Sequence, residues 1–316
     1  MQKSSLSLVL LALICGSLGW WTGRQQTAAE RVDVRRELLD EISVNRSLRE
    51  ECFNNLRNQF TPGFRFAQVL PDPHDVTLSM TQGQIFKTGV PLDLAVHGGK
   101  GFFMLSYEDE VLYTRDGRFR LRNDALQAAD EKGTVLGYKV DEKGVADQTL
   151  RPIEIVLEPS TKLYDGRFTD LHVDEEGTLY GTHYELGEDV PLYRVALTSF
   201  VSPERLERAG TTLLRQTSQA RLFRQGVAGQ WDFGQICPGS LELANVDVTQ
   251  QTYVIGALRL HAGLLGETPP PVPTAASPPP VAPNGWPVSP HPALPPSMMN
   301  INPYATGLNP SSLFSR

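Results

Sequence analysis

The chain of 316 residues is long enough for one or two domains with buried cores, and its 40% hydrophobic and 21% charged residues predict a globular middle part. The net charge of −7 and the lack of a dense lysine or arginine cluster argue against a nucleic-acid binder. Three cysteines without a Cys-x-x-Cys pair are too few for a disulfide scaffold and do not suggest a zinc site.

Residues 1–23 predict a signal or anchor segment. Lys3 is followed by residues 6–21, which carry no charge and end in two tryptophans that suit the aromatic belt at a membrane surface. This stretch of 16 residues is slightly shorter than the usual membrane span of about 17–25 residues. We expect an uncleaved anchor in a membrane, and the alternative is cleavage after Ala29.

Residues 24–60 predict one long helix. Its apolar side chains recur at steps of about three and four residues, and this narrow stripe suits the seam of a coiled coil better than a deep core. Asn45 and Arg49 interrupt the stripe, and the alternative interpretation is a solvated spacer helix. The stripe consists of Val34, Leu38, Ile42, Leu48, Cys52 and Leu56.

The helix is expected to end at a sharp turn. Residues 54–65 read Asn-Asn-Leu-Arg-Asn-Gln-Phe-Thr-Pro-Gly-Phe-Arg. Because proline disfavours helical backbone in the residue before it, the helix must end before Pro62. Pro62 and Gly63 then fit the two central positions of a type II turn, in which glycine supplies the positive φ.

Residues 61–240 predict a β-rich body, because turn signals recur at short intervals between short β-prone runs. The segment 113–119 predicts the clearest hairpin, since its Asp-Gly pair favours a type I′ turn. Residues 97–101 (His-Gly-Gly-Lys-Gly) look like a phosphate-binding loop, but a strand rather than a helix follows them, so we interpret them as a hairpin turn. Examples of the β-prone runs are residues 153–157 and 193–197.

Residues 241–266 predict a second helix, in which Asp247 and Gln250 fit a capping box. Residues 267–316 form a tail of different composition, with 15 of the chain's 24 prolines and Arg316 as its one charged residue after Glu267. Such a tail cannot bury a core and is expected to be extended polyproline or disordered.

Two Pro-x-x-Pro segments in the tail, residues 280–283 and 287–290, have the spacing of ligands for proline-recognition domains. The alternative interpretation of the tail is a flexible spacer, because no basic residue flanks either segment.

The sequence contains no convincing catalytic, cofactor-binding or metal-binding residues. The six histidines are scattered, and none has the spacing of a metal motif. The best metal candidate is His172 near Asp174, but Gly177 indicates a solvated turn there. We therefore expect no enzymatic activity, no cofactor and no metal.

Three segments together resemble the signature motifs of the bacterial flagellar basal-body rod and hook proteins. They occur in the family's order and cover about residues 53–260. The first motif contributes Asn54, Asn55, Asn58, Thr61, Pro62, Gly63 and Phe64; the second contributes Asp93, Gly101, Phe102, Phe103, Tyr113, Thr114, Arg115, Asp116, Gly117 and Phe119; the third contributes Leu241, Glu242, Asn245, Val246 and Asp247.

The resemblance implies a mainly β fold, in which the β-rich body is flanked by N- and C-terminal helices that pack together. It implies a non-enzymatic structural subunit of the flagellar basal body, with other rod or hook subunits, or further copies of itself, as partners. By the resemblance, the helices would lie in the core of a tube. The apolar residues 6–21, rather than the resemblance, lead us to expect a tether to the inner membrane, with the helices and the body on the periplasmic side. Nucleic acid is not an expected partner.

The resemblance also implies roles for single residues. The three motif asparagines would satisfy backbone groups at the end of the first helix, and Asp247 would cap the second. Asp93, Arg115 and Asp116 would organise the first sheet. In the family the two helix ends are neighbours, so an exported body would allow a disulfide between Cys52 and Cys237; the alternative is two free thiols.

The apolar start and the proline-rich tail lie outside the resemblance. They favour a second hypothesis, in which the chain is a membrane-anchored periplasmic scaffold or binding module derived from the rod/hook family. In that hypothesis the tail recruits a partner.

Overall fold

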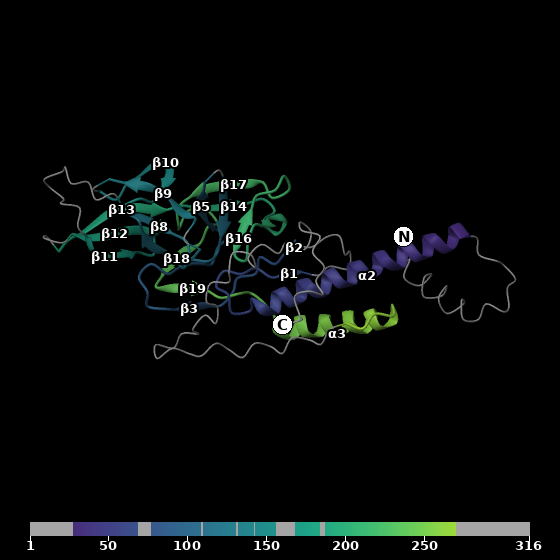
Figure 1. Ribbon diagram of the computed structural model, residues 1–316. Helices are drawn as coiled ribbons and strands as arrows, with labels where there is room; N and C mark the ends of the chain where they lie inside the picture. The colour runs from purple at the N-terminus through teal and green to yellow at the C-terminus, as the bar shows by residue number, and fades with distance from the viewer. Residues whose placement is uncertain are drawn as a thin grey trace.

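The chain folds into a β-rich body with a pair of helices at one end (Figure 1). The computed structural model describes residues 28–68, 77–108, 110–130, 132–141, 143–155, 168–183 and 187–269. The mainly β class predicted from the sequence is confirmed. The predicted anchor (1–23) and nearly all of the tail lie outside these ranges. Within them, no helix combines the length and the apolar character needed to cross a membrane.

The helix pair consists of α2 (Ala28–Arg57) and α3 (Val248–Leu264), which run antiparallel (Figure 1). Cys52, Phe53 and Leu56 of α2 pack against Ile255 of α3 in a small buried core. The spacing of three and four residues places these side chains on one face of α2, as the apolar stripe predicts.

The second helix begins later than predicted. Residues 241–247 are not helical: Leu241 and Glu242 are buried in strand β19 (Ser240–Glu242), and the chain then stays extended. Asp247, in extended conformation, accepts a hydrogen bond from Gln250 N (2.9 Å) and so caps α3. Pairing of β19 with the body therefore outweighs the helix propensity of this segment.

The strands of the body are short, as the frequent turn signals predict. Before the middle of the chain they are β1 (Ala67–Gln68), β2 (Thr77–Leu78), β3 (Ile85–Lys87), β4 (Leu94–His97), β5 (Phe102–Tyr107), β6 (Glu110–Thr114), β7 (Arg120–Arg122), β8 (Ala125–Gln127), β9 (Thr134–Val140) and β10 (Ala146–Pro152). The later ones are β11 (Phe168–Val173), β12 (Thr178–His183), β13 (Asp189–Val195), β14 (Leu197–Phe200), β15 (Glu207–Arg208), β16 (Leu213–Arg215), β17 (Leu222–Gly226) and β18 (Gln235–Pro238), with a 3-10 turn, η1, at Pro203–Arg205.

Thirteen of these strands form one large sheet, whose main path runs β11-β12-β13-β9-β5-β6-β16-β15. Strands β10 and β8 pair with β9, β7 pairs with β8, and β14 pairs with β5 and β17. Three two-stranded sheets, β1–β2, β4–β18 and β3–β19, complete the described strands, and all the pairings are antiparallel. The pairs β1–β2 and β3–β19 lie on the side of the body next to the helices (Figure 1).

The centre of the large sheet is buried on both faces. In β5, Phe103 and Leu105 belong to one apolar cluster, whereas Phe102 and Met104 belong to another on the opposite face. This follows from the geometry of a strand, in which successive side chains point to opposite faces. A run of four apolar residues is therefore needed at this position.

The predicted hairpin over residues 113–119 is wrong. Strand β6 pairs with β5 and β16, and β7 pairs with β8, so the two strands that flank the segment do not pair with each other. Neither Asp116 nor Gly117 has the positive φ that a type I′ turn requires. A Cβ on Gly117 would lie only 1.6 Å from the carbonyl oxygen of Leu94. This glycine thus permits a close backbone approach.

Residues 97–101 also do not form a hairpin, since β4 pairs with β18 whereas β5 pairs with β6, β9 and β14. Lys100 N instead donates to Asp232 O (2.7 Å) in a distant loop. The predicted strand over residues 153–157 is reduced in its described part to one bridge, between Glu154 and Ala125. The run over residues 193–197 is divided between β13 and β14.

Candidate functional site

The three motif segments meet at a buried junction between the helix pair and the body, which we call the motif junction. The turn after α2 has the predicted form: Phe64 N donates to Thr61 O (3.2 Å), and Gly63 has a φ of +69°. Gly63 N also donates to Glu242 O (2.7 Å). A Cβ on Gly63 would lie 2.1 Å from Asp116 N, so the turn touches both other segments and has no room for a side chain.

A buried ion cluster joins one charged residue from each segment. Glu242 is 0% exposed; its Oε1 accepts from Arg65 Nη2 (2.6 Å) and its Oε2 accepts from Arg115 Nη1 (3.1 Å). Gly83 N donates a further hydrogen bond to Oε1 (2.8 Å). Because a buried charge is costly unless it is paired and hydrogen-bonded, this cluster tolerates only one arrangement of the three chain segments.

Backbone carbonyl groups accept hydrogen bonds from other N–H groups of the two guanidinium groups. Arg115 Nη2 donates to Gly99 O (2.8 Å), and Arg65 Nη1 donates to Thr81 O (2.7 Å). Burial lowers the pKa of Arg115 to about 10, although the carboxylate of Glu242 opposes this shift. Arg115 is therefore still protonated at neutral pH.

Asparagine side chains connect α2 and the segment before α3 to residues 66 and 67, where the first strand begins. Asn55 Oδ1 accepts from Ala67 N (3.0 Å), while its Nδ2 donates to Ala67 O (2.9 Å) and to Gln251 Oε1 of α3 (3.0 Å). Asn245 Oδ1 accepts from Phe66 N (3.0 Å). These amides satisfy backbone groups that a strand at the edge of the body would otherwise leave unpaired.

The other polar residues of the first motif close the end of α2. Asn58 Nδ2 donates to Asn54 O (2.9 Å), and Thr61 Oγ1 donates to Asn58 Oδ1 (3.1 Å). The last carbonyl groups of a helix have no partner within the helix, so side-chain donors at this end stabilise it. Asn58 thus bonds a backbone carbonyl at the end of α2, whereas the Asn54 side chain bonds the side chains of Glu51 and Asn58.

The acidic residues of the second motif pair with nearby arginines. Asp93 Oδ1 accepts from Arg120 Nη1 (2.7 Å), and Asp116 Oδ2 accepts from Arg118 Nη2 (2.6 Å). Both carboxyl groups are nearly inaccessible to solvent, whereas the arginines are partly exposed. The Asp93–Arg120 pair joins the loop before β4 to β7, whereas the Asp116–Arg118 pair is local to the segment after β6.

The apolar residues of the second and third motifs lie in or beside the core. The ring centroids of Phe103 and Phe119 are 5.1 Å apart in an edge-to-face contact. Phe102 and Tyr113 make similar contacts with Phe200, at 5.8 Å and 4.8 Å. The remaining residues are Thr114, whose Oγ1 donates to Thr212 O (2.8 Å), Gly101, whose N donates to Phe233 O (3.1 Å), the buried Leu241 and the half-buried Val246.

A second polar cluster, at the far end of α3, was missed from the sequence. Asn45 Nδ2 donates to Leu258 O (3.0 Å), Arg49 Nη2 pairs with Glu267 Oε2 (2.7 Å), and Arg46 Nη2 pairs with Glu267 Oε1 (2.5 Å). We call these residues the α3 latch. Asn45 and Arg49 lie on the apolar stripe of α2. Their position on this buried face could have predicted that they contact α3.

Cys52 and Cys237 are free thiols, so the implied disulfide is not formed. Cys52 is buried in the helix pair, and burial raises its pKa to about 12. Cys237 lies in β18, where it faces Ala95 of β4 across the pair of strands. The extended segment around β19 separates Cys237 from α3, and so Cys237 lies in the body and not at a helix end.

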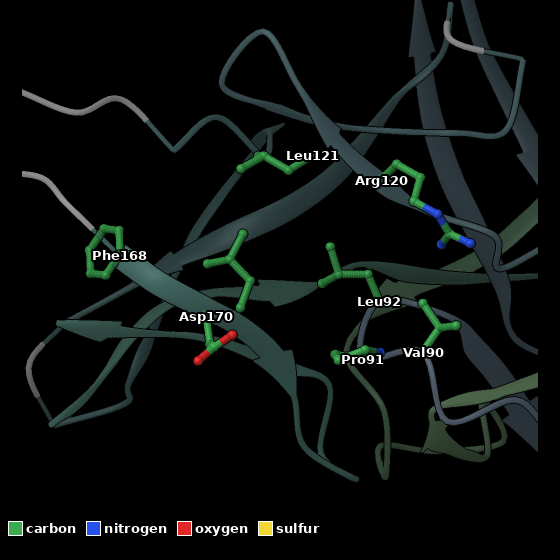
Figure 2. A pocket seen from close by; sticks show the side chains of 8 residues that line it. Val90, Pro91, Leu92, Arg120, Leu121, Phe168 and Asp170 are labelled. Atoms are coloured by element: carbon green, nitrogen blue, oxygen red, sulfur yellow. The ribbon is translucent and has the colours of Figure 1, made fainter. Parts of the chain in front are cut away.

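A shallow cavity of about 310 Å³ opens on the body between the loop before β4, β7 and β11. Figure 2 shows the mainly apolar lining, with Arg120 beside Val90 and with Phe168 and Asp170 on the other side. The guanidinium group of Arg120 is paired with Asp93. Across the described ranges, no three His, Cys, Asp or Glu side chains gather in a way that could hold a metal ion.

Comparison with known proteins identifies relatives whose names agree with the motifs. The flagellar basal-body rod protein FlgG of Borreliella burgdorferi is 25% identical over 170 residues, which are 54% of this chain and 56% of that protein. FlgG of Buchnera aphidicola is 26% identical over 230 residues, 72% of this chain and 76% of that protein. The flagellar hook protein FlgE of Rhizobium meliloti is 35% identical over 79 residues, 25% of this chain and 19% of that protein.

No protein-family model matches the chain. The relatives nevertheless define a class, the rod and hook proteins of the bacterial flagellum. This chain is related to that class at modest sequence identity, as its three motifs indicate. The match spans about half the length of the first of these relatives and a fifth of the hook protein.

Proposed function

We propose that the chain is a non-enzymatic structural subunit of the flagellar basal body, a rod- or hook-like axial protein on its periplasmic side. The observation that carries this proposal is the motif junction, where Arg65, Arg115 and Glu242 are buried together. A subunit of a tube must hold its helices at a fixed angle to its body. A buried network in which the carboxylate pairs with both guanidinium groups favours this rigidity, because separating the segments leaves buried charges unpaired.

In this proposal the helix pair supplies the assembly surface. Tyr253, Leu260 and Leu264 are exposed on α3, whereas Ile255 faces α2. The three exposed residues, with Ala257 between them, follow the three- and four-residue spacing of a helix face. An exposed apolar stripe on a monomer marks an interaction site, and a repeated head-to-tail contact generates a helical assembly. The partners would be other rod or hook subunits or further copies of this chain.

The periplasmic position and the tether are part of the same proposal. Residues 6–21 carry no charge, and Lys3 before them favours a cytoplasmic start by the positive-inside rule. The helix pair and the body would then lie in the periplasm.

The proposal is tested by isolating basal bodies from cells that carry the tagged wild-type protein or the double variant Leu260→Ser, Leu264→Ser. We expect the wild type to co-purify with basal bodies and the variant to be expressed but absent from them. Leu121→Ser is the matched control, because Leu121 is an exposed leucine of the body. If the wild type were recovered in membrane fractions but not in isolated basal bodies, this result would refute the axial role and favour the scaffold hypothesis.

A further inference from the structure

An exposed aromatic surface lies on the body and uses no residue of the motif junction. Trp231 and Phe223 are 61% and 50% exposed. The guanidinium carbon of Arg224 lies 4.5 Å from the centroid of the Phe223 ring and 5.4 Å from that of Trp231. These three side chains form what we call the aromatic surface, on β17 and the loop that follows it; β17 is labelled at the top of the body in Figure 1.

The fold holds Trp231 in an unfavourable backbone conformation. Its φ is +47°, and it is one of three non-glycine residues with positive φ in the described part of the chain. Its ring contacts the buried ring of Phe233 edge-on, with the centroids 5.5 Å apart. Gly226 leaves room for it, since a Cβ there would lie 2.8 Å from Trp231 Cζ3. Strain that presents a large apolar ring to solvent indicates a binding role, because packing does not require it.

The side chains of the aromatic surface offer hydrogen-bond donors. The indole of Trp231 has one N–H group and the guanidinium of Arg224 has five, and neither side chain accepts hydrogen bonds. Among the residues that the structure describes, neither group has a hydrogen-bond partner. Strand β17 pairs with β14 and with no second strand of the described part. A complementary ligand would therefore be extended to lie along β17. It would have flat apolar rings to contact the aromatic side chains and free carbonyl groups to accept their hydrogen bonds.

The proline-rich tail of this chain has that chemistry. Residues 268–316 contain 15 prolines and Arg316 as the one charged residue. Proline has no N–H group, and the carbonyl groups of a polyproline II helix are free to accept hydrogen bonds. Domains that recognise such helices bind them in grooves lined by aromatic side chains.

The tail is also long enough to return to the body. Helix α3 has 17 residues and is about 25 Å long at 1.5 Å per residue. At about 3.1 Å per residue, residues 269–283 would span about 43 Å as a polyproline II helix. The first Pro-x-x-Pro segment can thus pass back along α3 and reach the body.

We propose that residues 280–290 of the tail dock on the aromatic surface of the same chain. Proline rings stack on Trp231 and Phe223, and tail carbonyl groups accept hydrogen bonds from the indole and from Arg224. The interaction is independent of the axial role, because it uses neither α3 nor the motif junction.

Site-specific photo-cross-linking tests this proposal in the purified full-length protein in detergent. A benzophenone amino acid replaces Phe223, and the cross-linked peptides are identified by mass spectrometry. We expect cross-links to residues 280–290. Trp231→Ala should lower their yield about tenfold, as truncation of an aromatic anchor does at other interfaces. Val145→Ser, at another exposed apolar residue of the body, should leave the yield unchanged.

A second probe at Tyr253, an exposed aromatic residue of α3, separates docking from random contact. We expect few cross-links to residues 280–290 from this position, although the part of the tail before residue 280 can pass near α3. A mixture of isotope-labelled and unlabelled protein shows whether the tail comes from the same or a neighbouring chain. Arg224→Gln should also lower the yield. Because this variant keeps Trp231, it still tests the proposal if Trp231→Ala does not fold. Equal yields of cross-links to residues 280–290 from positions 223 and 253, or cross-links from 223 to other segments only, would overturn the proposal.

Discussion

At the scale of single residues, Gly63 is the most constrained position of the motif junction. It needs a positive φ for the turn after α2, and the backbone of Asp116 occupies the place of any side chain. Gly89 has a similar φ of +74°, but open space surrounds it. The two glycines therefore separate the cost of backbone strain from the cost of a steric clash.

We expect Gly63→Ala to lower the free energy of unfolding by about 3 kcal/mol or more, because strain and clash add. Gly89→Ala, where strain alone acts, should cost about 1 kcal/mol. Urea denaturation followed by circular dichroism measures both values. Equal losses in the two variants would mean that the contact with Asp116 relaxes freely.

The charge of Glu242 is needed because two guanidinium groups are buried beside it. Glu242→Gln would leave Arg65 and Arg115 without a counter-charge, so we expect a loss of about 3–5 kcal/mol in the free energy of unfolding. Glu110→Gln is the matched control, since Glu110 forms an exposed pair with Arg215 (2.8 Å). Such surface pairs contribute about 0–1 kcal/mol. A loss at Glu242 no larger than at Glu110 would contradict the importance of the buried cluster.

Cys52 of the helix pair and Cys237 of the body should differ in reactivity. With a pKa of about 12, Cys52 has about one thiol in ten thousand ionised at pH 8, and it is also buried. Cys237 is partly exposed, although burial raises its pKa as well. In a Cys15→Ser variant, an aromatic disulfide reagent at pH 8 should therefore modify Cys237 first. Raising the pH increases both rates, and equal rates in the folded protein would contradict the described burial of Cys52.

At the scale of secondary-structure elements, the α3 latch determines where the helix pair ends. Gly266 has a φ of +83°, which ends α3 and turns the chain, so that Glu267 reaches Arg46 and Arg49. Arg49 is 5% exposed at its side chain and Arg46 is 48% exposed. The pair with Arg49 should therefore contribute more to stability than the pair with Arg46.

We expect Arg49→Met to increase amide hydrogen exchange in residues 258–264 by about tenfold, because the end of α3 loses its buried anchor at a cost of about 1–2 kcal/mol. Arg46→Met should change exchange there less than about threefold, since its pair is exposed. Exchange measured by mass spectrometry on both variants decides the point. The opposite order would show that the helix end depends on the exposed pair.

At the scale of the whole molecule, the apolar residues 6–21 predict where the protein is located. If residues 6–21 are an uncleaved anchor, the intact protein should remain in the membrane pellet after a high-salt wash. Salt screens surface charges but does not weaken the burial of an apolar helix. N-terminal sequencing of the extracted protein completes the measurement. A mature chain that begins near Glu30 would show that the segment is cleaved.

The sequence by itself determined the local features of this protein. Pro62 and Gly63 predicted the turn after α2, and Asp247 predicted the cap of α3, because each signal depends on a few neighbouring residues. Frequent turn signals predicted a body of short strands. The three motifs indicated the relation to rod and hook proteins, although their residues are up to about 190 positions apart in the chain.

The tertiary structure alone decided how these features meet. The Asp116-Gly117 pair suggested a hairpin. Glycine is instead needed at position 117 because the backbone of Leu94 lies too close for a Cβ atom. Leu241 and Glu242 pair with β3 and are not helical, and the ion cluster that Glu242 forms has no signal in the surrounding sequence. The physical reason is common to all three cases. Burial and strand pairing between distant segments contribute more free energy than local propensity, and a sequence pattern reports only the local part.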